Sequence, residues 1–145
     1  MNSFDDPSSR ADKFILKDGD VVFTCRGIGY KTALIHDIGN NKVVPSSNLM
    51  VIRPDSEYLD SMYLNYFLNS SLGKECIKRI QKGGVIPTIT KSSLDNMEIP
   101  VMDKDTQEVV VTRYQIINKK INEIREQLIA LEQKTDKIIT DLVGE

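Results

Sequence analysis

Short runs of apolar residues separated by turn-forming residues occupy the first third of the chain. The stretch "FILKDGDVVFTCRGIGYKTALI" (14–35) predicts strand, turn, strand, turn and strand, because its apolar runs are β-branched or aromatic and its turns contain glycine. The stretch "NLMVIRP" (48–54) predicts one more strand, which Pro54 ends. This part of the chain is therefore expected to form a small sheet.

The apolar spacing changes to a helical period after residue 58. The new spacing predicts a helix that either Ser56 or Asp60 would cap. Gly73 is expected to interrupt this helix, and Lys74–Ile80 to form a second, shorter one. The residues that set the period are Leu59, Met62, Tyr63, Tyr66 and Phe67.

The segment 81–100 mixes glycine, lysine and proline with a few apolar residues. It predicts a loop, then one helical turn near Ser92–Asn96 with Ser92 as its cap, and then a short strand at Met97–Pro100. Asp103 and Asp105 follow this segment and suit the positive end of the dipole of the next helix.

No proline or glycine interrupts residues 104–142, and apolar residues recur there at alternating intervals of four and three. Such a heptad repeat is typical of a coiled coil, and the helix would be on the order of 55–60 Å long. A helix of this length needs another helix to cover its apolar seam. The predicted seam consists of Val110, Tyr114, Ile117, Ile121, Ile124, Leu128, Leu131, Thr135, Ile138 and Leu142.

The charges beside the seam bear on the kind of partner. With Tyr114 at an a position, Thr135 also falls at a and is a candidate for setting the register. The mostly cationic g row suits an acidic partner or an antiparallel arrangement better than a tight parallel homodimer. The flanking residues are Arg113, Lys120 and Lys134 at g, and Arg125 and Glu132 at e.

These patterns together predict an α+β fold. A small sheet-and-helix part is expected over residues 1–103, with residues 1–13 as a flexible lead, followed by one long coiled-coil helix over 104–143. No apolar run reaches the roughly 18 residues of a membrane span, and the N-terminus has no apolar signal core. The chain is therefore expected to be a cytoplasmic protein.

Composition argues against an enzyme. His36 is the only histidine, and Cys25 and Cys76 form no C-x-x-C pair, so we expect two reduced, buried thiols, no metal and no cofactor. The G-I-G at residues 27–29 lacks the remaining spacing of a nucleotide-binding loop. Asp18 and Asp20 are explained by turn formation around glycine rather than by acid–base catalysis.

The net charge is only −2, but basic residues gather in two segments. Residues 26–53 carry a net charge of +3, and residues 74–91 carry +4. Such segments fit a focused contact with phosphates, although scattered solvated lysines would give the same charge count. Arginine can bind two acceptors of guanine and asparagine can do so on adenine. The DNA-binding candidates are Arg26, Tyr30, Lys31, Asn48, Lys82, Gly83, Gly84, Thr88 and Lys91.

The order of these segments is informative as a set. "LKDGDVVFTCRGIGYKTALI", "SSNLMVIRP", "YLDSMYLNYFLNSS" and "GGVIPTITKSSLDNMEIPVMDKDTQ", followed by a long heptad helix, resemble the DNA-specificity (S) subunit of type I restriction–modification systems. The resemblance covers residues 14–142 and corresponds to the latter part of one target recognition domain plus the helix after it. Gln107 lies where the family has a glutamine at the helix start, although "VMDKDTQ" replaces the usual Pro-Pro run.

The resemblance implies a non-catalytic subunit that reads half of a split DNA sequence. It implies as partners double-stranded DNA, methyltransferase subunits and, in restriction complexes, translocase/nuclease subunits. A complete subunit has two recognition domains and two antiparallel helices. This chain therefore resembles a half-subunit, a domain exchanged by recombination or a piece cut from a longer protein, and homodimerisation through the helix is the leading hypothesis. A coiled-coil interaction module that does not bind DNA, and an anti-restriction or regulatory fragment, are the alternatives.

Overall fold

The computed structural model describes residues 14–27, 29–83 and 86–143. The chain forms two compact units, Met1–Glu108 and Val109–Glu145, and each is described by itself. The expected flexible lead over residues 1–13 and the DNA-binding candidate Gly84 lie outside the described residues.

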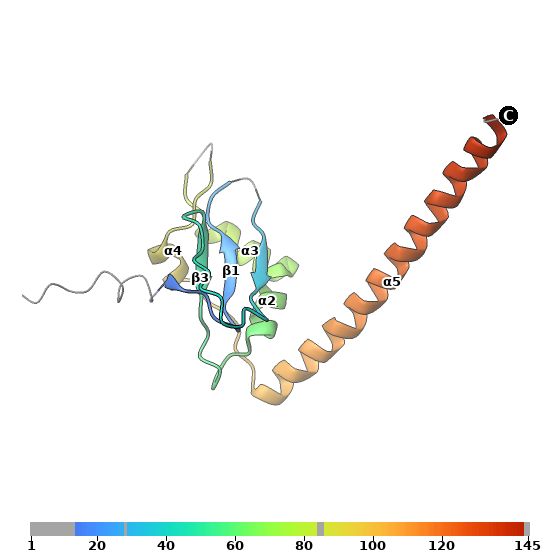
Figure 1. Cartoon of the computed structure of the whole chain (residues 1–145). Helices are drawn as coiled ribbons and strands as arrows, with labels where there is room; N and C mark the ends of the chain where they lie inside the picture. The colour runs from blue at the N-terminus through green and yellow to red at the C-terminus, as the bar shows by residue number, and fades with distance from the viewer. Residues whose placement is uncertain (1–13, 28, 84–85, 144–145) are drawn as a thin grey trace, which may run out of the picture. The chain divides into compact units, whose positions relative to one another are not determined.

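A three-stranded antiparallel sheet forms the centre of the first unit (Figure 1). The strands are β1 (Val21–Thr24), β2 (Thr32–Leu34) and β3 (Leu49–Ile52), in the order β2-β1-β3. In the register of the sheet, Val22 lies opposite Ala33 on one side and Val51 on the other. These three strands were predicted from the sequence, and the α+β class is confirmed.

The strand predicted at the start of the stretch 14–35 is wrong. Residues 15–17 are not in a strand, although Leu16 N donates to Val43 O at 2.8 Å. The backbone N–H of Lys17 instead donates to Asp20 Oδ2 at 2.8 Å. This side-chain bond closes the turn and uses a donor that a sheet ladder would need.

Two helices follow the sheet, α2 (Ser61–Asn69) and α3 (Ser71–Ile80). Asp60 caps α2, because its Oδ1 accepts from Tyr63 N at 2.8 Å. The break between the helices lies at Ser70 and not at Gly73 as predicted. Ser70 is extended and its Oγ accepts from Gly73 N at 3.1 Å, so a serine N-cap starts the second helix before the glycine is reached.

The next helix, α4 (Lys91–Asp95), differs from the prediction in its cap. Thr90 and not Ser92 is the N-cap, and it forms a reciprocal capping box with Ser93. Residues 97–100 form no strand. Their backbone is held instead by a side chain, because Tyr63 Oη donates to Pro100 O at 2.8 Å.

The core of the first unit lies where β1 meets the helices. Side chains of β1 pack with those of α2, with Ile77 of α3 and with Ile89. Both cysteines are free, and Cys25 is buried as predicted, whereas Cys76 is only half-buried. The fully or nearly fully buried apolar residues of this core are Val21, Phe23, Leu64, Leu68, Ile77 and Ile89.

The long helix predicted after residue 103 is α5 (Lys104–Val143), which has 40 residues. Asp103 lies just before it and accepts from the backbone N–H and the hydroxyl of Thr106 at 2.9 and 2.8 Å. The hydrogen bond from the Thr106 backbone is the main cause that lowers the pKa of Asp103. None of the helices in the described part of the chain is long and apolar enough to cross a membrane.

Candidate nucleic-acid interface

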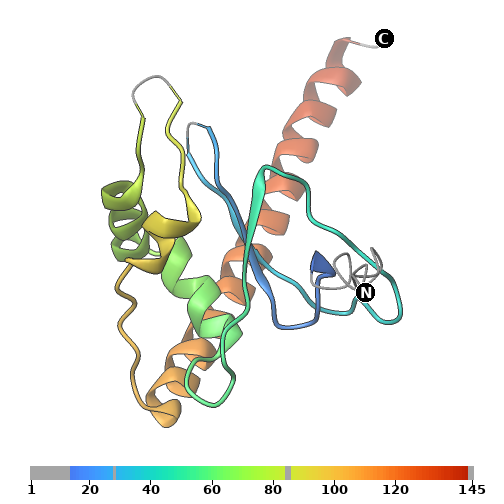
Figure 2. The same cartoon turned by 90° about the vertical axis from the view of Figure 1, so that its left-hand side faces the viewer.

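Two loops that are far apart in the sequence pair with each other beyond one end of the sheet (Figure 2). Arg26, which follows β1, forms an isolated antiparallel bridge with Thr88, and Thr88 forms another with Lys82. Gly27 N donates to Pro87 O at 3.2 Å, and Ile89 N donates to Cys25 O at 2.9 Å. The backbone therefore places the two predicted basic segments side by side.

Asn48 and Lys31 join the same region through backbone contacts. Cys25 N donates to Asn48 O at 2.9 Å, and the Cys25 thiol donates to the same oxygen at 3.2 Å. Lys31 lies across the hairpin from Thr24, with Lys31 N donating to Thr24 Oγ1 at 3.0 Å and Thr24 N donating to Lys31 O at 3.1 Å. The end of β1 thus holds three separate segments together.

We call this region the paired-loop surface and define it by Arg26, Gly27, Lys31, Asn48, Lys82, Gly83, Ile86 and Thr88. The side chains of Arg26, Lys31 and Lys82 are exposed. Neither the stretch 25–31 nor the stretch 82–89 contains an acidic residue. Three cations without an interspersed carboxylate attract phosphates over a distance of about one Debye length, roughly 10 Å at moderate salt.

Gly83 makes the second loop sterically possible. Its φ is +103°, a conformation that side chains rarely adopt, and an added Cβ would lie 3.0 Å from Ile86 O. The backbone at Gly83 therefore takes a conformation that suits glycine, and Thr88 pairs with Lys82. The glycine has a structural role that does not depend on any contact with DNA.

Tyr30 differs from the groove or stacking residue that the sequence predicted. Its ring packs against the core, and its hydroxyl donates to Leu68 O at 2.5 Å. Burial, with a smaller contribution from Cys76, raises the pKa of Tyr30 to about 12. We therefore leave Tyr30 out of the paired-loop surface.

Lys91 is not among the residues that the two bridges of that surface join. It is the first residue of α4 and lines a groove of about 580 Å³, which the residues of β3 and Leu94 of α4 also line. A DNA contact of Lys91 stays a prediction.

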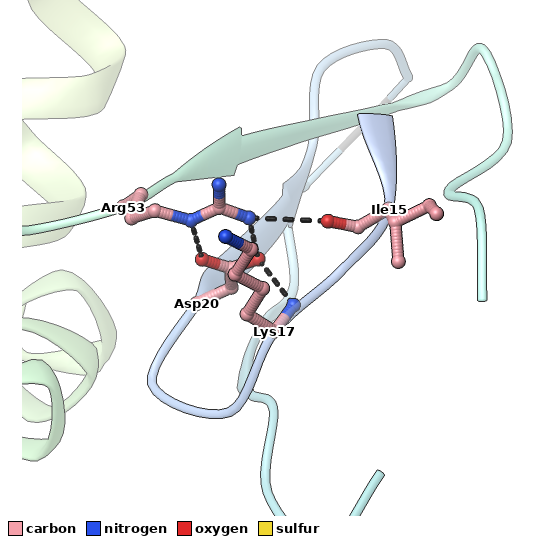
Figure 3. A network of polar contacts seen from close by, with 4 residues as sticks. All are labelled: Ile15, Lys17, Asp20 and Arg53. Atoms are coloured by element: carbon pink, nitrogen blue, oxygen red, sulfur yellow. Dashed lines mark hydrogen bonds and ion pairs between the residues drawn. The ribbon is translucent and has the colours of Figure 1, made fainter. Parts of the chain in front are cut away.

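Asp20 and Arg53 form an ion pair near the other end of β1 (Figure 3). Arg53 Nε donates to Asp20 Oδ1 and its second terminal nitrogen to Oδ2, both at 2.7 Å, and that nitrogen also donates to Ile15 O at 3.1 Å. Burial alone would raise the pKa of Asp20, but the hydrogen bonds from Arg53 and Lys17 N outweigh it and lower that pKa. The same hydrogen bond to Asp20 raises the pKa of Arg53.

This ion pair changes the charge count made from the sequence. Arg53 was counted among the cations of the segment 26–53, but its charge is balanced by the buried carboxylate of Asp20. Asp18 is also a turn residue, since its Oδ1 accepts from Ile38 N at 3.0 Å. Both aspartates therefore have structural contacts beside the Gly19 turn.

The residue patterns alone did not single out Ile86, which is exposed on the paired-loop surface, or Gln107, which is buried outside it. Ile86 is 63% exposed at the turn of a basic loop, where an apolar side chain can contact a thymine methyl group. Nothing in the local sequence distinguishes Ile86 from the other apolar residues of its loop. Gln107 is 1% exposed, and only the family resemblance, not its polar side chain, marked it in the sequence.

The described residues contain no group of three or more His, Cys, Asp or Glu side chains that could hold a metal ion. The polar chemistry of the paired-loop surface is that of phosphate and base recognition: cationic nitrogens, an amide, a hydroxyl and backbone groups.

The comparisons with known proteins bear on the fold and the family of the chain. No curated protein matches the chain. A solved structure, the HsdS subunit from Thermoanaerobacter tengcongensis, matches with a TM-score of 0.62 at 20% identity, over 87% of this chain and 32% of that one. The chain thus spans about a third of that relative, and the likeness shows the fold. The family model for the type I restriction modification DNA specificity domain matches residues 2–133, and the chain belongs to this family.

Proposed function

We propose that this chain is a non-catalytic DNA-recognition component of a type I restriction–modification complex and that the paired-loop surface contacts the DNA. The observation that carries the proposal is the pairing of Arg26 and Lys82 with Thr88. This pairing gathers two separate basic segments at one end of a rigid sheet. The membership of the chain in the DNA specificity family supports the same reading.

The chemistry of each side chain suggests its role. Lys31 and Lys82 bind phosphates, which sets the position of the domain on the duplex without reading sequence. Arg26 and Asn48 are exposed near the end of β1 and would read guanine and adenine by two hydrogen bonds each. Two paired loops have the width of a β-ribbon, which the major groove of B-DNA accepts.

The helix α5 provides the attachment. Its seam residues from Tyr114 onwards, Thr135 apart, are exposed apolar side chains, and such a surface is covered by another helix in the assembled complex. We propose that α5 pairs with a second helix and that the assembled chain docks methyltransferase subunits.

Charge reversal in the loops tests the DNA contact. The variants Arg26→Glu and Lys82→Glu are assembled with cognate methyltransferase subunits, and DNA affinity and site-specific adenine methylation are measured at several salt concentrations. We expect at least about a tenfold loss of affinity and a flatter salt dependence for each variant. Lys42→Glu is the matched control, because Lys42 is exposed and lies outside the paired-loop surface.

Unchanged affinity in both loop variants would remove the paired-loop surface from the DNA interface. That outcome would favour the alternative in which the chain is an interaction module, because the exposed apolar seam of α5 would still offer a surface for a protein partner. Loss of affinity in Lys42→Glu as well would indicate a general effect of net charge.

A further inference from the structure

The open part of the α5 seam begins some way along the helix. Gln107 occupies a heptad a position but is buried within the first unit, and Val110 is half-buried. The apolar seam residues after Val110 are all exposed, from 38% at Tyr114 to 76% at Leu142. The seam that needs a partner is therefore centred on the C-terminal two thirds of α5.

The charges at e and g distinguish the ways in which two copies of α5 could pair. In a parallel pair in register, each g residue faces the e residue five positions later on the other helix. Lys120 would then face Arg125 of the second copy, twice in the dimer. No other facing g–e pair in this register joins two opposite charges that could compensate for this repulsion. The parallel arrangement is thus unfavourable.

Antiparallel pairing over the full seam is also frustrated. In antiparallel coiled coils g faces g and e faces e. In the full overlap, Lys120 would face Lys134 of the second copy, and Arg125 would face Arg125 of the second copy. The one attractive pair would be Arg113 with Asp141. A shift of the second helix by one heptad, so that the overlap lies closer to the N-terminal end of both seams, would place Arg113 opposite Lys134.

A shift of one heptad in the other direction moves the overlap toward the C-terminal end of both seams. No facing pair of g or of e residues then joins two like charges. Lys120 then faces Asp141 of the second copy, and Arg125 faces Glu132, each twice in the dimer. A further heptad would oppose Lys134 to itself and Glu132 to itself. The intrahelical ion pair of Lys120 with Glu123, 3.2 Å long and exposed, is weak enough to exchange.

We propose that α5 pairs with α5 of a second copy of this chain, antiparallel and in this staggered register, with Val110 and Tyr114 left outside the seam. The proposal rests on the pairing role given to α5 above. Eight core layers cover the most exposed part of the seam. The layers, each formed twice, are Ile121 with Ile138, Leu128 with Leu131, Thr135 with Ile124, and Leu142 with Ile117 of the second copy.

The variant Arg125→Glu separates the arrangements by the direction of its effect. In the staggered register the introduced carboxylate faces Glu132 of the second copy twice, and we expect the dimer dissociation constant of the full chain to rise about tenfold. In the full overlap one like-charge pair replaces another, so the constant would stay the same. In the parallel pair a repulsion disappears, so the dimer would tighten.

A charge swap provides the rescue. Glu132→Arg alone should weaken the dimer in the staggered register, and Arg125→Glu combined with Glu132→Arg should restore it, because the facing charges are again opposite. Arg125 and Glu132 are seven residues apart on one helix, so the swap creates no intrahelical i,i+4 pair between them. Lys119→Glu, at a position away from the seam, is the control and should leave the constant unchanged.

Sedimentation equilibrium of the full-length chain measures all four variants. Weakening by each single change with rescue by the double change supports the staggered pair. An unchanged or tighter Arg125→Glu dimer overturns the register while leaving α5 as a pairing helix. A wild-type chain that stays monomeric at about 100 μM, with its helix intact by circular dichroism, overturns the second copy as partner. DNA binding by the paired-loop surface is tested separately and does not depend on these results.

Discussion

The side chain of Gln107 holds the backbone of Asp60, which is 47 residues earlier in the sequence. Gln107 Oε1 accepts from Asp60 N at 2.8 Å, and Asp60 itself caps α2 through its side chain. The amide nitrogen of Gln107 donates to Tyr58 O at 2.9 Å and to Met102 O at 2.7 Å. One buried amide therefore fixes the first turn of α5 against the segment that starts α2.

Replacing Gln107 by leucine should destabilise the first unit. The change keeps the size but leaves Asp60 N, Tyr58 O and Met102 O without their partner, and a buried group left unpaired costs about 1–3 kcal/mol. We expect a loss of at least about 2 kcal/mol in the free energy of unfolding by urea. Tyrosine fluorescence is a suitable probe, because four of the five tyrosines lie within residues 30–66.

The matched control is Gln133→Leu, the same substitution at an exposed position of α5. Its midpoint should stay within error of the wild type. An equally small effect at Gln107 would mean that water replaces the three hydrogen bonds at little cost, and that Gln107 does not anchor the helix.

The Asp20–Arg53 pair predicts a dependence of stability on pH. The pKa of Asp20 is lowered in the folded state, so the stabilisation is complete above the ordinary aspartate value of about 3.9 and is lost as pH falls through the lower folded value. Arg53→Met would leave Asp20, which is 1% exposed, without its cation. Because the guanidinium is itself 46% exposed, we expect a moderate loss of about 1–3 kcal/mol at pH 7.

The difference between wild type and Arg53→Met should be largest above pH 5 and should shrink as pH is lowered below 4. Urea unfolding at a series of pH values measures this difference. Lys42→Met removes an exposed cation from the same basic segment and should give a small difference that does not change with pH. A constant difference for Arg53→Met would show that packing of the arginine stem, and not its charge, stabilises the sheet.

Local sequence patterns predicted the elements better than their ends. The strands and helices were found because periods of two and of three to four residues report which face is buried. The cap at Thr90 and the break at Ser70 were missed because serine and threonine recur at neighbouring positions, and only the backbone shows which hydroxyl meets an N–H. The strand predicted at Met97–Pro100 failed because its order comes from the hydroxyl of Tyr63, a distant residue.

The candidate site was predicted in part for a related reason. Basic, glycine-containing loops are visible in the sequence, but the pairing of Arg26 with Thr88 is a contact across 62 residues and leaves no local signal. The role of Arg53 was misread because charge counting cannot see the buried carboxylate of Asp20. Tyr30 was predicted to contact DNA because an aromatic residue between glycine and lysine looks exposed, whereas the structure packs it, partly buried, against the core.

Gly73 predicts a steric effect of a single methyl group. A Cβ at this position would lie 2.1 Å from Phe67 O and 2.8 Å from the Cα of Leu68, and backbone atoms cannot move aside as a flexible side chain can. Gly73→Ala should therefore separate α2 from α3 and cost about 1–3 kcal/mol or more, despite the better helix propensity of alanine. Thermal unfolding followed by tyrosine fluorescence measures the loss.

Ser71→Ala is the control for that change, because Ser71 is exposed in the first turn of the same helix. A Gly73→Ala variant as stable as this control would show that the two helices can separate freely.

The hydroxyl of Tyr30 predicts an effect at alkaline pH. The folded pKa of about 12 lies above the ordinary tyrosine value of about 10, so the stabilisation is complete below pH 10 and is lost as pH rises from 10 to 12. Tyr30→Phe keeps the ring but removes the hydrogen bond to Leu68 O, and should cost about 1 kcal/mol at pH 7. Ultraviolet titration should show that the variant has lost a tyrosine that ionises near pH 12 in the folded protein. Because the ring packs against the core and lies outside the paired-loop surface, the variant should bind DNA like the wild type once folded, and a large loss of affinity with unchanged stability would return Tyr30 to the interface.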